Sequence, residues 1–89
     1  MAKYTNLTAD TLIRTGNGRV HGFIVNSHTS GTVKLWDNTS AATTVICNTI
    51  TLAAGPQVYN FPAPIEFYTG LYCDIGGTID LTIIWDQGV

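Results

Sequence analysis

The last third of the chain alternates apolar and polar residues with a period of two. In residues 71–75 and again in residues 79–85, the odd positions are apolar and most even positions are polar or aromatic. Neighbouring side chains of a β-strand point to opposite faces, so this pattern is typical of strands with one buried face. Gly76-Gly77 separates the two runs and predicts a hairpin turn, with three loop residues or a bulge to bring both apolar sets to one face.

The composition favours strands along the whole chain. Fourteen of the 89 residues are threonine, and valine and isoleucine are also frequent. These β-branched side chains lose rotamer freedom in a helix but fit a pleated sheet. Gly, Pro and Asn interrupt the apolar runs at intervals of about ten residues. We therefore predict an all-β fold, a single small β-sandwich or jelly-roll-like domain of about seven or eight short antiparallel strands.

Residues 19–26 and 32–37 are expected to pair as a second hairpin, because both are β-rich and a polar loop separates them. In residues 32–37, Val33 and Leu35 share one face of the strand. Trp36 then lies on the opposite face, away from the apolar side of the sheet.

The middle of the chain contains further strand and turn signals. Residues 43–52 read as one bent strand or two short ones, and residues 57–61 as another strand. Asp37–Ser40 has the composition of a turn. Pro62 and Pro64 cannot donate to a hydrogen-bond ladder, so we place residues 62–64 at a sheet edge or in a connecting loop.

The length fits one domain. We divide it into residues 1–17, an N-terminal arm or short edge strand, and residues 18–89, the β-sandwich, with a turn around Asn17 between them. A chain of this size buries only roughly 60–65% of its unfolded surface, so contacts with neighbouring subunits would add to its stability.

Charged residues make up only 11% of the chain, against roughly 25% in an ordinary soluble domain. A surface so poor in charge would promote self-association, so we expect a subunit of a symmetric assembly. The four basic residues and Asp10 lie in the first 34 residues, which sum to +3, whereas the other five carboxylates sum to −5. This asymmetry steers head-to-tail contacts between copies, docks one end of the molecule on a charged partner, or arises by chance. With a net charge of −2 and no basic cluster, no nucleic-acid partner is expected.

The N-terminal sequence MAKYTNLTAD lacks the apolar region of a secretion signal, and no apolar run approaches the roughly 20 residues of a membrane span. We expect a chain that is made in the cytoplasm and stays soluble, with no membrane partner. Cys47 and Cys73 match neither a redox motif nor a zinc pattern and are expected to be core thiols. No cofactor or metal ion is expected.

No segment predicts catalysis. His28 has Ser27 and Ser30 nearby, but no nucleophile-elbow pattern accompanies them, so we do not expect an enzyme. A binding function stays open, because exposed aromatic rings can stack on sugars, whereas other aromatic residues fill cores or anchor protein interfaces. The aromatic residues considered for this role are Trp36, Tyr59, Tyr68, Tyr72 and Trp85.

Two segments resemble small virion proteins of tailed bacteriophages. The first, GTVKLWDNTSAATTVI (31–46), follows a Y/W-D-x-T-S-A-x-x-T-V-I pattern. The second, FYTGLYCDIGGTIDLTIIW (67–85), resembles their typical ending, T-G-L-Y-x-x-I/S-G-G-T-x-D-x-T-V-x-Y. The likeness spans roughly residues 6–86 and carries no catalytic or ligand residues. Asp37, Gly76 and Gly77 match it as turn positions, and Asp86–Val89 extends past the usual aromatic or basic terminus.

The resemblance implies a head decoration (cement) protein, a compact β-fold that binds the outside of an icosahedral shell, often as a trimer. Its partners would be the major capsid protein and other copies of itself. Its location would be the capsid surface of the virion, after synthesis in the host bacterial cytoplasm. Two alternatives stay open: a carbohydrate-binding or host-adhesion module on a head fibre or tail, and a structural subunit of the tail or neck.

The candidate interface residues fall in three segments. The basic N-terminal segment is the candidate contact with the capsid, and the proline-containing edge is the candidate contact with a sister subunit. The sugar-binding alternative depends on Trp36. The candidate interface residues are Lys3, Tyr4, Arg14, Trp36, Phe61, Pro62 and Pro64.

Overall fold

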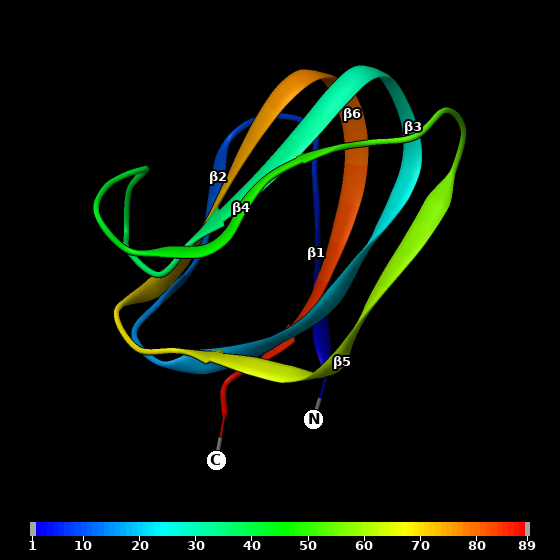
Figure 1. The fold of residues 1–89 in the computed structure, drawn as a ribbon. Helices are drawn as coiled ribbons and strands as arrows, with labels where there is room; N and C mark the ends of the chain where they lie inside the picture. The colour runs from blue at the N-terminus through cyan, green and yellow to red at the C-terminus, as the bar shows by residue number, and fades with distance from the viewer. Residues whose placement is uncertain (1, 89) are drawn as a thin grey trace.

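Six β-strands and no helix are present in residues 2–88, the part of the chain that the computed structural model describes (Figure 1). All strand pairings are antiparallel. The strands are β1 (Lys3–Leu7), β2 (Thr11–Thr15), β3 (Gly18–Trp36), β4 (Val45–Thr51), β5 (Gln57–Phe67) and β6 (Gly70–Asp86). The predicted all-β fold class is confirmed.

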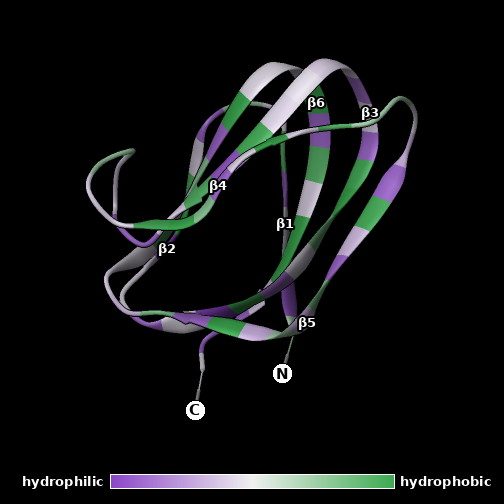
Figure 2. Cartoon of the chain, in the orientation of Figure 1, coloured by the Kyte–Doolittle hydropathy of each residue, from purple (hydrophilic) through white to green (hydrophobic). Residues whose placement is uncertain are grey.

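The C-terminal segment is one continuous strand, β6, so the predicted hairpin is wrong. Its buried apolar residues, from Leu71 to Trp85, are all odd-numbered on both sides of Gly76-Gly77. Figure 2 shows this alternation of hydrophobic and hydrophilic residues along β6. A two-residue turn would have put the two apolar sets on opposite faces, whereas a continuous strand keeps them on one face. Gly76 is itself a strand residue and pairs with Thr32 of β3.

Residues 19–26 and 32–37 do not pair with each other either, because nearly all of them lie in the single long strand β3. This strand pairs with β6 along almost its whole length. Two long strands thus replace two predicted hairpins, which is why the described residues contain six strands instead of seven or eight. The predicted orientation of residues 33–36 is confirmed: Val33 and Leu35 are fully buried, and Trp36 lies on the other face.

Both long strands bend at the same level, so the sheet folds back on itself. At the bend, Thr29 of β3 is opposite Thr78 of β6, and the register of the pairing shifts just beyond this pair. Ser30 (φ 50°) and Gly77 (φ 74°) adopt left-handed backbone conformations there. A Cβ atom at Gly77 would lie 2.5 Å from the carbonyl oxygen of Ser30, so only glycine fits. We call this bend the crease; it comprises residues 28–32 and 76–78.

The crease divides the sheet into two facing layers, and β3 and β6 pass through both (Figure 1). Layer 1 has the strand order β1-β6-β3-β5, and layer 2 has the order β2-β6-β3-β4. Within the described residues, β1, β2, β4 and β5 each pair with one long strand only and are therefore edge strands. The predicted edge position of Pro62 and Pro64, in β5, is confirmed. The arrangement is compatible with a sandwich, although its strands form one continuous sheet.

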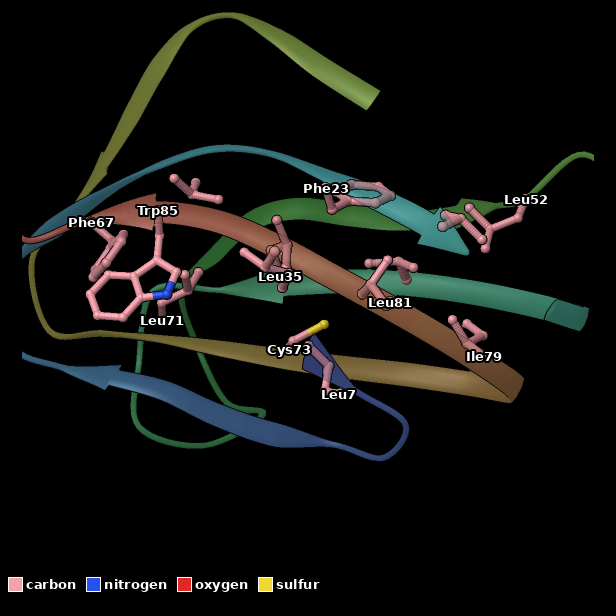
Figure 3. Close-up of a cluster of buried hydrophobic side chains, with 14 residues drawn as sticks. Leu7, Phe23, Leu35, Leu52, Phe67, Leu71, Cys73, Ile79, Leu81 and Trp85 are labelled. Atoms are coloured by element: carbon pink, nitrogen blue, oxygen red, sulfur yellow. The ribbon is translucent and has the colours of Figure 1, made fainter. Parts of the chain in front are cut away.

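The hydrophobic core lies between the two layers and takes side chains from both (Figure 3). Leu81 and Ile83 of layer 1 are fully buried, as are Leu35 and Cys73 of layer 2. Neither layer could bury its apolar face without the other. The core side chains are Leu7, Val20, Phe23, Val25, Val33, Leu35, Leu52, Phe67, Leu71, Cys73, Ile79, Leu81, Ile83 and Trp85.

The first seventeen residues contribute two strands to the sheet. β1 pairs with the end of β6 and places Leu7 in the core, while β2 pairs with the beginning of β6. The β1–β2 segment therefore follows β6 around the bend. Because Lys3 is opposite Trp85, both ends of the described chain lie at the same end of the molecule, away from the crease (Figure 1).

Candidate interaction surfaces

Half of the ten charged residues, although separated in the sequence, are neighbours of opposite charge in the sheet. Arg19 of β3 is opposite Asp86 of β6 on one side and Glu66 of β5 on the other. Lys34 of β3 is opposite Asp74 of β6. Cross-strand neighbours of opposite charge attract, so the charge asymmetry supports the strand register within one molecule. Attraction between copies is not required to explain it.

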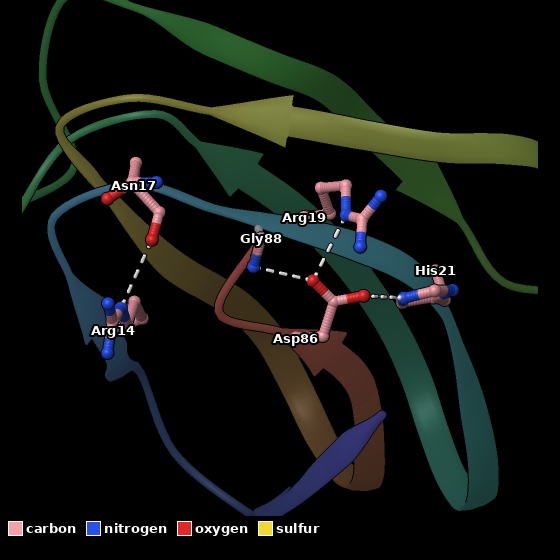
Figure 4. A network of polar contacts seen from close by, with 6 residues as sticks. All are labelled: Arg14, Asn17, Arg19, His21, Asp86 and Gly88. Carbon is pink, nitrogen blue, oxygen red and sulfur yellow. Dashed lines mark hydrogen bonds and ion pairs between the residues drawn. The ribbon is translucent and has the colours of Figure 1, made fainter. Parts of the chain in front are cut away.

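Asp86 has only 2% of its surface exposed and is surrounded by hydrogen-bond donors (Figure 4). Its Oδ1 accepts hydrogen bonds from Arg19 Nε at 3.1 Å and from the backbone amide of Gly88 at 2.6 Å. Its Oδ2 accepts one from His21 Nε2 at 2.6 Å. These hydrogen bonds, that of His21 first, hold the pKa of Asp86 well below its usual range. The network fastens the end of β6 to the start of β3, which is a structural role.

His28, the histidine with Ser27 and Ser30 nearby in the sequence, is held by backbone groups. Its Nε2 donates a hydrogen bond to the carbonyl of Ala53 at 2.5 Å, and its Nδ1 accepts one from the amide of Gly31 at 3.1 Å. A carbonyl only accepts and an amide only donates, so both ring nitrogens are engaged. This arrangement fixes the segment before β5 against the crease and leaves neither nitrogen free to act as a base.

Residues 31–46 and residues 67–85 meet at Asp37. Its carboxylate accepts hydrogen bonds from three consecutive amides of the β5–β6 turn: Tyr68 at 2.9 Å, Thr69 at 2.8 Å and Gly70 at 3.3 Å. The amide of Gly16, in the β2–β3 turn, donates to the carbonyl of Thr69 at 2.8 Å. We call these joined turns the Asp37 cluster. Its contacts give a physical reason for an aspartate in one segment to accompany Tyr-Thr-Gly in the other.

Two carboxylates lie close together on the outer side of layer 2. Asp10 Oδ1 accepts a hydrogen bond from the amide of Ile75 at 2.9 Å, which brings Asp10 beside Asp74. Burial, and then the Asp10 carboxylate, raise the pKa of Asp74, while Lys34 opposes this effect. Among the described residues, no group of three or more His, Cys, Asp or Glu side chains is arranged to hold a metal ion.

Three of the aromatic residues considered as a sugar platform do not share one surface. Trp85 is buried in the core. Tyr59 is half-buried and stacks on Phe23, with ring centres 4.7 Å apart. Tyr68 is 71% exposed in the Asp37 cluster. These three residues therefore do not form a common platform.

The other two, Trp36 and Tyr72, belong to an apolar row across the outer face of layer 2. Leu12 pairs with Tyr72, Tyr72 with Trp36, and Trp36 with Val45, so each of the four strands contributes one residue. We call these four residues the outer row. Leu12 and Val45, at its two ends, are 41% and 40% exposed. An apolar row on a solvent-facing surface is a candidate contact surface.

The predicted interface residues lie on separate parts of the molecule. One group lies on β1 and β2, the strands that pair with β6. A second group lies on β5, which pairs with β3, and Trp36 belongs to the outer row. The first group is Lys3, Tyr4 and Arg14, and the second is Phe61, Pro62 and Pro64. Phe61 also packs edge-to-face on Phe23, with ring centres 6.2 Å apart, and so borders the core. The structure does not bring these residues into one continuous surface.

A small pocket of about 150 Å³ lies beside the Asp37 cluster, and no sequence pattern indicates it. Its lining includes Asn17, Arg19, Glu66 and Tyr68, which come from segments far apart in the chain. Pockets for small-molecule ligands usually measure about 300–1,000 Å³, so this one suits the tip of a partner's side chain or ordered solvent.

Comparisons of the chain with protein-family models, with curated proteins and with solved structures found no match. No helix long and apolar enough to cross a membrane occurs in residues 2–88.

Proposed function

We propose that this protein is a structural subunit of a bacteriophage virion, a non-catalytic decoration protein that binds the outside of the head and stabilises the shell. The observation that most directly supports the proposal is the Asp37 cluster, because the two segments that resemble virion proteins are the segments that meet there. A likeness that coincides with a structural contact is less easily an accident of composition. The partners are the major capsid protein and other copies of the chain, for which the resemblance implies a threefold arrangement.

The proposed role needs many weak contacts and not one strong site. A shell under pressure from packaged DNA is strengthened when a small protein bridges neighbouring capsid subunits, and many copies on a rigid lattice act together. The low proportion of charged residues supports such a role, because it favours a surface that is partly covered by partners.

Lys3 and Arg14 are the candidate contacts with the shell. Among residues 2–88, neither forms an ion pair, whereas Arg19 and Lys34 have acidic neighbours across the sheet. Arg14 Nε donates to the carbonyl of Asn17 at 3.2 Å, which leaves the terminal guanidinium nitrogens for a partner (Figure 4). A basic edge of this kind would orient the protein on an acidic shell surface.

Cosedimentation with heads assembled without this protein tests the proposal. We expect the protein to sediment with the heads and to raise the temperature at which they release DNA. The double change Lys3→Glu and Arg14→Glu should weaken binding by about tenfold or more at moderate ionic strength. Thr49→Glu on β4 serves as the control for added negative charge. Deleting the N-terminal segment is a poorer test, because Leu7 belongs to the core.

Failure of the unaltered protein to bind such heads would exclude the decoration role. Electron cryo-microscopy of purified particles would then separate the head from the tail or neck. Density on the tail or neck would favour the structural-subunit alternative.

The outer row favours a second candidate function, sugar binding, because it places Trp36 beside Tyr72 on a solvent-facing surface. Lys34 Nζ lies 4.3 Å from the centre of the Trp36 ring and would have to move for a sugar to stack there. Binding on a glycan array that is lost in Trp36→Ala and kept in Tyr68→Ala would support this function over the decoration role.

A further inference from the structure

We propose that β1 is a self-association edge, which pairs antiparallel with β1 of a second copy about a twofold axis at Thr5. This contact joins the two copies of layer 1 into one continuous sheet in the order β5-β3-β6-β1-β1-β6-β3-β5. The proposal does not rest on the decoration role.

Among the four edge strands of the described residues, β1 alone has an undisturbed ladder. Its five residues pair with β6 without a register shift. By contrast, β2 has a shift between Leu12 and Arg14, the pairing of β4 with β3 has two shifts, and β5 has one shift and two prolines. Bulges and prolines are among the devices that keep sheet edges from pairing with other chains. Among the described edge strands they are present on three and absent from β1, whose one charged residue is Lys3.

The sequence of β1 is also complementary to itself. Full overlap of two antiparallel copies places Thr5 opposite Thr5, Tyr4 opposite Asn6, and Lys3 opposite Leu7 of the other copy. Each pair joins residues of the same parity, so the inner and outer faces of the two sheets continue into each other. Other registers leave part of the strand unpaired.

This register also keeps the charges of the two copies apart. Lys3 is the one charged residue of β1, and in this register it lies opposite a leucine. The two copies of Lys3 are then about four residues, or about 14 Å, apart along the ladder, beyond the Debye length of roughly 8–10 Å. No like charges therefore meet in this register.

The pairing would also cover the most exposed aromatic residue of the edge. Tyr4 is 76% exposed and points to the outer face. In the dimer its ring lies against Asn6 of the other copy, whose side chain donates to Asp80 Oδ1 at 2.7 Å and to Thr82 Oγ1 at 3.1 Å. A five-residue ladder is smaller than the roughly 800 Å² per partner of a standard stable interface, so we expect a dissociation constant in the micromolar to millimolar range.

Thr5 is the residue to change, because it lies opposite Thr5 of the second copy on the twofold axis. Thr5→Lys and Thr5→Glu each put two like charges directly opposite each other, and each should weaken dimerisation about tenfold or more. An equimolar mixture of the two variants puts opposite charges on the axis and should restore pairing. Both variants remove the Thr5 hydroxyl, whose Oγ1 accepts a hydrogen bond from Trp85 Nε1 at 3.0 Å. Thr15→Lys on β2 is the control for added charge.

Sedimentation velocity from about 10 µM to about 500 µM, with thermal melts to confirm folding, measures the outcome. We expect the average mass of the unaltered protein to rise toward that of the dimer with concentration, each Thr5 variant to remain near the monomer mass, and the mixture to rise again. A constant mass of the unaltered protein over this range would overturn the proposal. So would a mixture that associates no better than either variant alone.

Discussion

Asp86 is a buried carboxylate whose ionised form the fold stabilises. Hydrogen bonds from His21, Gly88 and Arg19 lower its pKa below the value of about 3.9 expected in the unfolded chain. Its contribution to stability is therefore present above about pH 4 and is lost as the pH falls toward the folded-state pKa. We expect Asp86→Asn to lower the melting temperature at pH 7 and to reduce its further fall below pH 4. Thermal denaturation between pH 7 and pH 3 measures both effects.

Asp74 should behave in the opposite way and serves as the comparison. Burial and the neighbouring Asp10 raise its pKa in the folded state, so its contribution to stability is present below the unfolded-state pKa and is lost as the pH rises through the folded-state pKa. Asp74→Asn removes the crowding of carboxylates and should raise the melting temperature at pH 7. A lower melting temperature would mean that the contact with Lys34 outweighs this crowding.

The two cysteines flank Leu35 on neighbouring strands, since Cys47 and Cys73 are both opposite it. Two strand spacings put their Cα atoms about 10 Å apart, beyond the roughly 7 Å limit for a disulfide. Burial, followed by the charges of Asp10 and Asp74, raises the pKa of Cys73 to about 12. We expect a thiol reagent to label Cys47 first and Cys73 only when the protein unfolds, as measured by mass spectrometry over time. Labelling at equal rates, or a disulfide between the two, would contradict the structure.

The buried face of β6 could be predicted from its sequence, but its partner could not. The buried apolar residues of β6 are all odd-numbered from Leu71 to Trp85. Because this alternation continues unchanged through Gly76-Gly77, it also indicates one continuous strand. The hairpin prediction gives more weight to Gly76-Gly77, although glycines within strands also mark sharp bends. The deciding contact is with β3, which is far away in the sequence, and a local pattern does not reveal it.

In the candidate surfaces, too, the sequence predicts the position of single residues but not their partners. The outward position of Trp36 follows from the period of two, and Asp37 is recognisable as a turn residue. The amides that Asp37 binds belong to another turn, and the partners of buried Asp86 belong to another strand. Such partners are fixed by topology, so sequence reasoning missed them.

The crease should be sensitive to a single methyl group. A Cβ at Gly77 would lie 2.5 Å and 2.7 Å from the carbonyl oxygens of Ser30 and Thr29, whereas a Cβ at Gly55 would have nothing within 4 Å. Both glycines have positive φ angles, so alanine at either site costs about 1–2 kcal/mol of backbone strain. We expect Gly77→Ala to lower the free energy of unfolding by about 1–3 kcal/mol more than Gly55→Ala. Urea denaturation of the two variants measures this difference, and equal losses would show that the crease tolerates the added atom.

For the molecule as a whole, both layers depend on the pairing of β3 with β6. The paired residues are far apart in the sequence, from Arg19 opposite Asp86 to Trp36 opposite Tyr72. Topologies dominated by such non-local pairs fold in about milliseconds to seconds, and the two layers should form together because the same strands run through both. Stopped-flow refolding followed by tryptophan fluorescence should give one phase in this range. Refolding in microseconds, or two separate unfolding transitions, would conflict with this topology.

The pairing of Lys3 with Trp85 also determines how the molecule would respond to mechanical load. Traction applied between its two ends would unzip β1 from β6 one residue pair after another, which requires little force. A force applied between the crease and the opposite end of the molecule would instead act on both long strands at the same time. A cargo fused to either end would project from the same pole and leave the crease pole unobstructed, which makes the fold a one-sided scaffold for display.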